Sequence, residues 1–296
     1  MLLNPFVTPR ALLGRPFAVL LLLLGMLAAC NDSDSDDDQP ATPEPTIKVA
    51  TAAGLGSFLT DKDGNTLYYF TRDIDGNNAC TGGCAAVWPI FNAEEIRVSG
   101  DLQAADFKTQ NTPGGQPQTT YKGWPLYYYA PAVNGQNTRE QPGQTTGNGV
   151  GNVWYVAQPN YSLMVATKSV TDKSTNQATV RTFLVDGQGR TLYTFGKDTR
   201  LPATQPTNCT GPCQTNWPPF FTASRNFPSV LQAADFGTIT RASTTPAGPY
   251  GEATNQQLTY KGRPLYFFAA DAQTRGRVEG NGVTTGEGDQ WQVAVP

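Results

Sequence analysis

The chain has 296 residues, of which 24 are acidic and 21 basic, and it contains no histidine. The lack of histidine excludes His-dependent catalytic triads and removes the commonest transition-metal ligand, so neither a metal nor another cofactor is predicted. Six of the 24 acidic residues lie between residues 32 and 44, which leaves the rest of the chain close to neutral and argues against nucleic acid as a partner. The 30 glycines and 23 prolines indicate short strands and abundant turns.

Residues 1–29 have the features of a signal peptide. Two arginines precede an apolar stretch that begins at Phe17 and is too short to span a bilayer. The segment ends in Leu-Ala-Ala before Cys30, which resembles the lipobox of bacterial lipoproteins. This resemblance implies that Cys30 is acylated and anchors the mature chain to a membrane. The alternative is an ordinary signal peptide followed by an incidental cysteine.

The residue after Cys30 and the segment that follows indicate where the chain is held. Asn31 stands at the position that, by resemblance to Gram-negative sorting rules, favours the outer membrane. Residues 30–47 then form an Asp/Ser run followed by prolines, with almost no apolar side chains to offset the entropy of ordering. We therefore predict an extended tether, with an acidic cation-binding tail as the alternative.

An internal duplication begins at residue 48 and predicts two homologous halves, 48–159 and 160–296. The sequence Leu-Gln-Ala-Ala-Asp-Phe occurs at 102–107 and again at 231–236, and both halves close on Trp-x-Val-Ala-x-Pro. A weaker repeat, Gly-x-x-Leu-Tyr-x-aromatic, is nested inside each half. Its four copies start at Gly64, Gly123, Gly189 and Gly262.

The nested repeat predicts the fold class. Each copy joins a turn signal to an aromatic-rich alternating run, which is typical of a β-hairpin. Thr194 replaces Tyr69 in the second half, so alternation predicts that Tyr68 and Phe70 face the core and that Tyr69 does not. We predict a mainly β protein of two pseudo-twofold halves. Each half would contain two hairpins and short helical segments, arranged either like a propeller or as paired small sheets.

Three of the four nested copies continue to an aspartate three residues after the second aromatic. They are Tyr68, Phe70, Asp73; Tyr193, Phe195, Asp198; and Tyr266, Phe268, Asp271. The fourth copy, with Tyr127 and Tyr129, has Ala132 in place of the aspartate. This pattern and a Cys-x3-Cys-x3-Trp-Pro element resemble a family of bacterial lipoproteins and secreted proteins that carry a Tyr-x-aromatic-x-x-Asp repeat. The resemblance covers nearly all of residues 48–296 and implies an uncharacterised envelope protein.

The repeated aspartates admit two interpretations. An aspartate just after a strand is well placed to accept backbone N–H groups of the following turn, and the loss at Ala132 is tolerable for that role. Alternatively, Asp73, Asp198 and Asp271 bind a cation or a sugar beside exposed tyrosines, or serve a hydrolase. Residues 61–65 and 73–77 faintly resemble calcium loops, but turn chemistry explains their glycine positions better.

The four remaining cysteines form two local pairs at the same spacing. Three connectivities are formally possible, and the presence of one pair in each half favours disulfides Cys80–Cys84 and Cys209–Cys213 in an oxidising compartment. A redox role for these short loops is one alternative. Zinc binding by four thiolates is another, but oxidation is expected to prevail outside the cytoplasm.

A further candidate site is aromatic. Trp124 has Arg263 as its counterpart in the second half, and this exchange predicts an exposed position. Together with Tyr127 and Tyr129, Trp124 would form a platform for a sugar ring or another planar ligand. The other tryptophans recur at matched places, which favours core packing.

The favoured function is that of an outer-membrane lipoprotein with no enzymatic activity, held by its lipid and acting as a binding or scaffolding module. Its partner would be a glycan, a peptide or a protein of the envelope. The alternatives are a periplasmic redox or electron-transfer accessory that uses the cysteine pairs and, less favoured, an Asp-dependent hydrolase.

Overall fold

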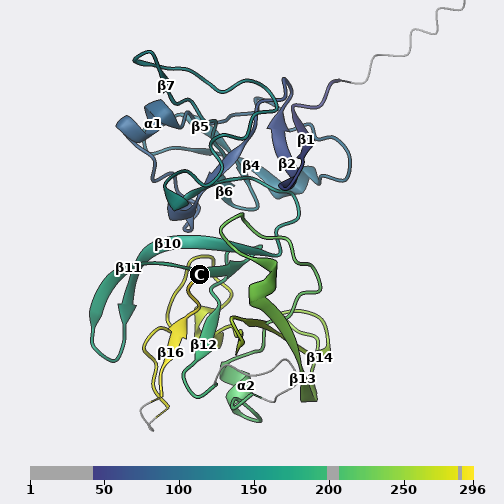
Figure 1. The fold of residues 1–296 in the computed structure, drawn as a ribbon, viewed down its shortest axis with the longest axis vertical. Helices are drawn as coiled ribbons and strands as arrows, with labels where there is room; N and C mark the ends of the chain where they lie inside the picture. The colour runs from purple at the N-terminus through teal and green to yellow at the C-terminus, as the bar shows by residue number, and fades with distance from the viewer. Residues whose placement is uncertain (1–42, 199–206, 286–288) are drawn as a thin grey trace, which may run out of the picture. The chain divides into compact units, whose positions relative to one another are not determined.

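The computed structural model describes residues 43–198, 207–285 and 289–296. The signal segment and Cys30 lie outside the described residues. The protein is mainly β and consists of two repeat-like halves made of small, open sheets (Figure 1). Of the two architectures expected, paired small sheets are therefore present, and a closed propeller is not formed by the described strands.

The first half contains nine short strands and one helical turn. They are β1 (Ile47–Ala52), β2 (Gly56–Asp61), β3 (Tyr68–Phe70), α1 (Gly83–Val87), β4 (Phe107–Asn111), β5 (Pro117–Tyr121), β6 (Trp124–Pro125), β7 (Ala132–Val133), β8 (Gln136–Asn137) and β9 (Trp154–Val156). Short 3₁₀ turns occur at η1 (Thr71–Asp73), η2 (Ala104–Asp106) and η3 (Val150–Asn152).

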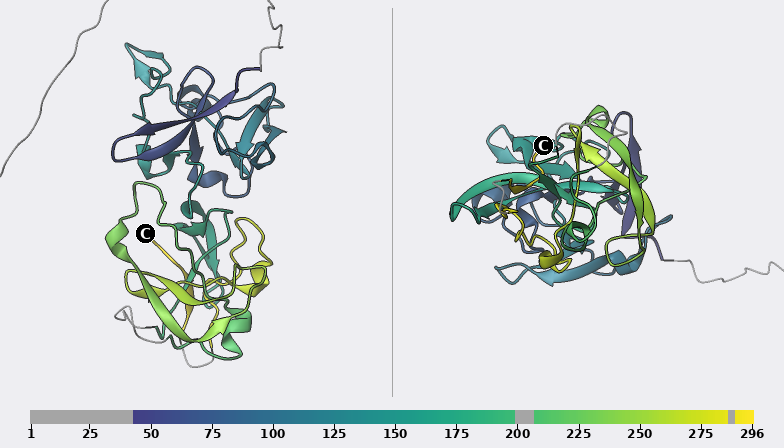
Figure 2. Two further views of the ribbon diagram at one scale, coloured as in Figure 1. Left: turned by 90° about the vertical axis from the view of Figure 1, so that its right-hand side faces the viewer. Right: turned by 90° about the horizontal axis from the view of Figure 1, so that it is seen from below.

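The second half repeats most of this order with longer hairpins, and its described residues contain no counterpart of the β7–β8 pair. Its elements are β10 (Leu163–Asp172), β11 (Gln177–Asp186), β12 (Tyr193–Phe195), α2 (Cys213–Asn216), η4 (Ala233–Asp235), β13 (Phe236–Thr245), β14 (Thr254–Tyr260), β15 (Arg263–Pro264), η5 (Ala269–Asp271) and β16 (Trp291–Val293). Strands β13 and β14 lie side by side in every view (Figures 1 and 2), in agreement with their antiparallel register.

The duplication is visible in the sheet pairing. Each half has an opening hairpin, a three-stranded sheet and a pair that joins an early strand to the last one: β1–β2, β4–β5–β6 and β3–β9 match β10–β11, β13–β14–β15 and β12–β16. The two nested repeats of each half meet through reciprocal backbone hydrogen bonds. They join Tyr68 to Tyr127 at 2.9 and 3.0 Å, and Tyr193 to Tyr266 at 2.8 and 3.0 Å.

The turns follow from the local sequence. Strands β5 and β6 are joined by Lys122 and Gly123 alone, which have φ of 47° and 79°. Positive φ at both central residues is the requirement of a type I′ turn, whose twist matches that of the strands. The turn after β2 is shaped by Asp61, whose carboxylate accepts the N–H groups of Asp63 and Asn65 at 3.0 and 2.8 Å. The apparent calcium loop at 61–65 is thus organised as a turn.

The core contains more aromatic side chains of strand β3 than the alternating pattern predicted. Tyr68 and Phe70 are buried as expected, but Tyr69 is only 1% exposed, so the prediction that it faces away from the core is wrong. The reason is that β3 is covered on both faces. Tyr69 packs with Trp124 and with Leu163 at the start of the second half, in one continuous cluster.

Candidate functional site

The motif tyrosines and carboxylates of the second half form reciprocal pairs. Tyr193 belongs to the first nested repeat and donates its hydroxyl to Asp271 of the second at 2.7 Å. Tyr266 of the second repeat donates to Asp198 of the first at 2.5 Å. The two nested repeats therefore exchange hydrogen bonds across the Tyr193–Tyr266 bridge, and neither can complete its own motif.

The first half keeps this arrangement although one aspartate is missing. Tyr127 donates to Asp73 at 2.5 Å, and Tyr68 donates to Glu140 at 2.5 Å. Glu140 is 8% exposed and occupies the role of the aspartate that Ala132 replaces. The sequence reasoning missed Glu140. The available signal was that it is the one acidic residue between Phe107 and Tyr161.

The second oxygen of each motif aspartate accepts a backbone N–H. Asp73 accepts from Ala79 at 2.8 Å and Asp198 from Asn208 at 2.7 Å, in each case from the residue just before the first cysteine of a pair. Asp271 accepts from the N–H of Glu279 at 2.8 Å. The carboxylates thus tie the strands to the loops that follow them, as expected of aspartates that organise turns.

Burial shifts the pKa values of Asp73, Asp271 and the motif tyrosines. Desolvation raises the pKa of Asp73 to about 7 and that of Asp271 to about 6, although the hydrogen bonds from tyrosine and backbone act in the opposite direction. Burial, together with the neighbouring carboxylates, also raises the pKa of the Tyr127 and Tyr266 hydroxyls. The tyrosines remain neutral donors at physiological pH. The four buried tyrosine–carboxylate pairs, called locks below, are Tyr68–Glu140, Tyr127–Asp73, Tyr193–Asp271 and Tyr266–Asp198.

The disulfides Cys80–Cys84 and Cys209–Cys213 are both formed, with 5.3 Å between the Cα atoms of each pair. This confirms the predicted local connectivity. The first cysteine of each pair is buried and the second is half-buried in a short helix, α1 or α2. With all four sulfurs in disulfides, none is a thiolate available to zinc.

Stacked aromatic rings pack against the locks. Trp154 stacks between Trp88 and Phe70, with centroid distances of 3.8 and 4.1 Å. Trp291 stacks in the same way between Trp217 and Phe195, at 3.7 and 4.2 Å. The edges of the lock tyrosines meet these stacks, since Tyr68 contacts Trp88 in a T-shaped arrangement at 5.4 Å. The repeated tryptophans are therefore part of the core.

The predicted platform of Trp124, Tyr127 and Tyr129 is not an exposed surface. Trp124 is 2% exposed and Tyr127 is fully buried, while Tyr129 is half-buried and lies 4.5 Å from the Trp88 ring. Trp124 is covered because the opening of the second half, including Leu163, packs in the same cluster, and because the Arg275 guanidinium lies 4.9 Å from its ring. The exchange of Trp124 for Arg263 was therefore misinterpreted. It marks a surface that is covered in the first half.

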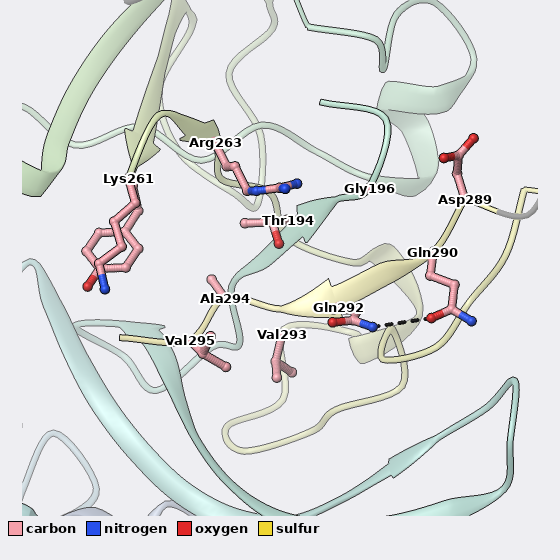
Figure 3. Close-up of a pocket in the computed structure, with 11 residues that line it drawn as sticks. Thr194, Gly196, Lys261, Arg263, Asp289, Gln290, Gln292, Val293, Ala294 and Val295 are labelled. Carbon is pink, nitrogen blue, oxygen red and sulfur yellow. Dashed lines mark hydrogen bonds between the residues drawn. The ribbon is translucent and has the colours of Figure 1, made fainter. Parts of the chain in front are cut away.

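The same surface of the second half is open and forms a groove of about 510 Å³ (Figure 3). Thr194, Arg263 and Gln292 stand there in place of the buried Tyr69, Trp124 and Tyr155. The groove is lined by Thr194, Gly196, Tyr260, Lys261, Arg263, Asp289, Gln290, Gln292, Val293, Ala294 and Val295. The sequence showed the exchanges, but a packing environment that differs between two repeats is not visible in their alignment.

Within residues 43–198, 207–285 and 289–296, no three cysteine, aspartate or glutamate side chains gather in a way that could hold a metal ion. In the same residues no helix has both the length and the apolar character needed to cross a membrane.

The fold and the locks define a class of protein, a duplicated, mainly β module with one short-range disulfide in each half. Residues 49–92 and 175–220 match a family model described as a secreted repeat of unknown function. The family model thus matches the chain twice, once in each half. Comparison with curated proteins and with solved structures gives no match.

Proposed function

We propose that this protein is an outer-membrane lipoprotein, anchored through an acylated Cys30, whose body is a binding or scaffolding module without enzymatic activity. The observation that carries the non-enzymatic part of the proposal is the reciprocal engagement of the motif carboxylates with buried tyrosines. The match to a secreted repeat supports a location outside the cytoplasm. The lipobox and Asn31 support the anchor and its membrane.

The locks weigh against an Asp-dependent hydrolase. A catalytic acid or base must come within hydrogen-bond reach of its substrate. Asp73 and Asp198 are fully buried, and each has one oxygen on a tyrosine hydroxyl and the other on a backbone N–H. These carboxylates maintain the fold, and binding is left to the surface of the molecule.

The redox alternative has weaker support. Thiol–disulfide exchange requires a thiolate to reach the sulfur that it attacks. Cys80 and Cys209 are 3% and 0% exposed, so only the half-buried partner of each pair is accessible.

Metabolic labelling of the full chain tests the anchor. When the protein is expressed in a Gram-negative host with radiolabelled palmitate, we expect label on the protein and its recovery with the outer membrane. Cys30→Ser should lose the label and become soluble. The double variant Cys80→Ser, Cys84→Ser is the matched control and should keep the label. An unlabelled wild-type protein, or label retained by Cys30→Ser, would contradict the proposal.

A further inference from the structure

The groove of the second half differs from its counterpart in chemistry as well as in exposure. In the first half Tyr69, Trp124 and Tyr155 belong to a closed apolar cluster with the start of β10. In the second half these three positions carry a hydroxyl, a guanidinium and an amide. All three aromatic rings have been replaced by hydrogen-bonding groups, and the groove that they line is open (Figure 3).

The charge in the groove favours an anionic ligand. Neither Lys261 nor Arg263 makes an ion pair within the described residues, whereas the Asp289 carboxylate lies 3.4 Å from Lys197. One Arg263 nitrogen donates to the Asp198 carbonyl at 3.1 Å, which holds the side chain over Thr194. The remaining N–H donors of its planar guanidinium group match the geometry of a carboxylate.

The neutral groups favour a ligand rich in hydroxyls. Gln290 directly precedes β16 and Gln292 lies within it. The Gln292 amide donates to the Gln290 side-chain oxygen at 3.2 Å (Figure 3), and the Gln290 amide nitrogen donates to the Ser174 hydroxyl at 2.8 Å, so each amide keeps part of its hydrogen-bonding capacity. Primary amides and the Thr194 hydroxyl offer both donors and acceptors, which sugar hydroxyls also require. The groove volume of about 510 Å³ lies within the usual range of sites for small molecules.

The strand edges around the groove disfavour an extended peptide. A peptide that adds to a sheet needs free N–H and C=O groups along an edge. Tyr193 in β12 exchanges backbone hydrogen bonds with Tyr266, and Trp291 in β16 donates to the Val283 carbonyl at 2.8 Å. Both edges of the β12–β16 pair are thus occupied. An apolar surface of a second copy is also disfavoured, because it would bury Arg263 and Gln292 without partners.

We propose that this groove binds an acidic oligosaccharide. Arg263 and Lys261 engage its carboxylates, while Thr194, Gln290 and Gln292 engage its hydroxyls. The inference rests on the proposed binding role and names its ligand class. Its failure is distinguishable from failure of the anchor, because substitutions in the groove leave Cys30 acylation unchanged.

Calorimetric titration of the detergent-solubilised full chain tests the proposal. Tetragalacturonate is the probe, its methyl ester is the neutral match, and tetraglutamate is the acidic peptide. We expect tetragalacturonate to bind, and the ester and the peptide to bind at least ten-fold more weakly. Arg263→Gln should reduce the affinity at least ten-fold. Lys62→Ala, which removes an exposed charge elsewhere, should leave it unchanged.

Thr194→Tyr provides a second variant that fills the groove as Tyr69 does in the first half, and it should also abolish binding. Circular dichroism checks that each variant is folded. The proposal is overturned if the wild-type chain does not bind tetragalacturonate or if folded Arg263→Gln binds it equally well. Equal affinity for tetraglutamate would assign the groove to acidic peptides. Self-association broken by Arg263→Gln would assign it to a second copy.

Discussion

Asp73 shows how one residue connects distant parts of the repeat. Its carboxylate joins Tyr127, which lies 54 residues further along the chain, to the N–H of Ala79 beside the disulfide. The motif spacing predicted an aspartate that orders a turn, and this followed from sequence because the contact is local. The tyrosine partner could not be predicted, because it depends on which strands become neighbours. Glu140 could not be predicted for the same reason. It is a longer acid at a different position, and it makes the bond to Tyr68 that an aspartate at position 132 would have made.

The raised pKa of Asp73 has a measurable effect on stability. Because the folded state holds the proton up to about pH 7 and the unfolded state releases it near pH 4, stability should fall as pH rises across this window. The slope for one such group is at most about 1.4 kcal/mol per pH unit. Urea unfolding at pH 4 to 8 should show this decline for the wild type and a flatter curve for Asp73→Asn. Asp271 contributes a smaller decline to both proteins. Parallel curves for the two proteins would contradict the raised pKa of Asp73.

At the scale of elements, the sequence predicted what is local and missed what is long-range. The short helical segments and the two disulfides were predicted because each is encoded within a few residues, and the duplication was predicted because its two copies can be aligned directly. The nested repeats at Gly123 and Gly262 form the predicted hairpins, β5–β6 and β14–β15. The strands that follow Gly64 and Gly189 pair instead with the last strand of their half, β3 with β9 and β12 with β16. A hairpin is recognised from the turn residues that join its two strands. An early strand that pairs with the last strand of a half has no such turn, so the sequence does not show the pairing.

The disulfides are expected to stabilise the protein modestly. Each closes a loop with a sequence separation of 4, for which chain entropy gives about 2 kcal/mol. The double variant Cys80→Ser, Cys84→Ser should lose about this amount in urea unfolding and keep its circular dichroism spectrum. The corresponding variant at Cys209 and Cys213 is the matched comparison. Loss of the folded spectrum would show instead that the loop is required for folding.

At the scale of the whole molecule, the two halves share a fold and differ in what their equivalent surfaces do. The surface around Trp124 is buried in a shared core, and the surface around Arg263 is open. Aligned repeats reveal that such positions have diverged. They do not reveal which of the two equivalent surfaces is exposed, because a tryptophan aligned with an arginine is compatible with exposure of either one.

This difference can be reversed by design. Introducing Thr194→Tyr, Arg263→Trp and Gln292→Tyr together restores the residues of the first half and should create an exposed aromatic patch that promotes association. Sedimentation velocity should show larger species than the wild type. The polar triple variant Thr194→Ser, Arg263→Lys, Gln292→Asn is the control and should behave like the wild type. Identical profiles for the two triple variants would refute this account of the exchanges.

The reciprocal locks also determine when the protein can fold. The hydroxyl of Tyr68 reaches a partner 72 residues later, and that of Tyr193 a partner 78 residues later. Strand β12 must wait longer still, because Tyr193 pairs with Val293 in β16, which is further away in sequence than either of these partners. Such distant closures slow folding, since loop entropy is lost before the contacts that compensate for it are made. A chain that emerges gradually from a ribosome or a translocation pore therefore cannot complete its second half until residues 291–293 have been released.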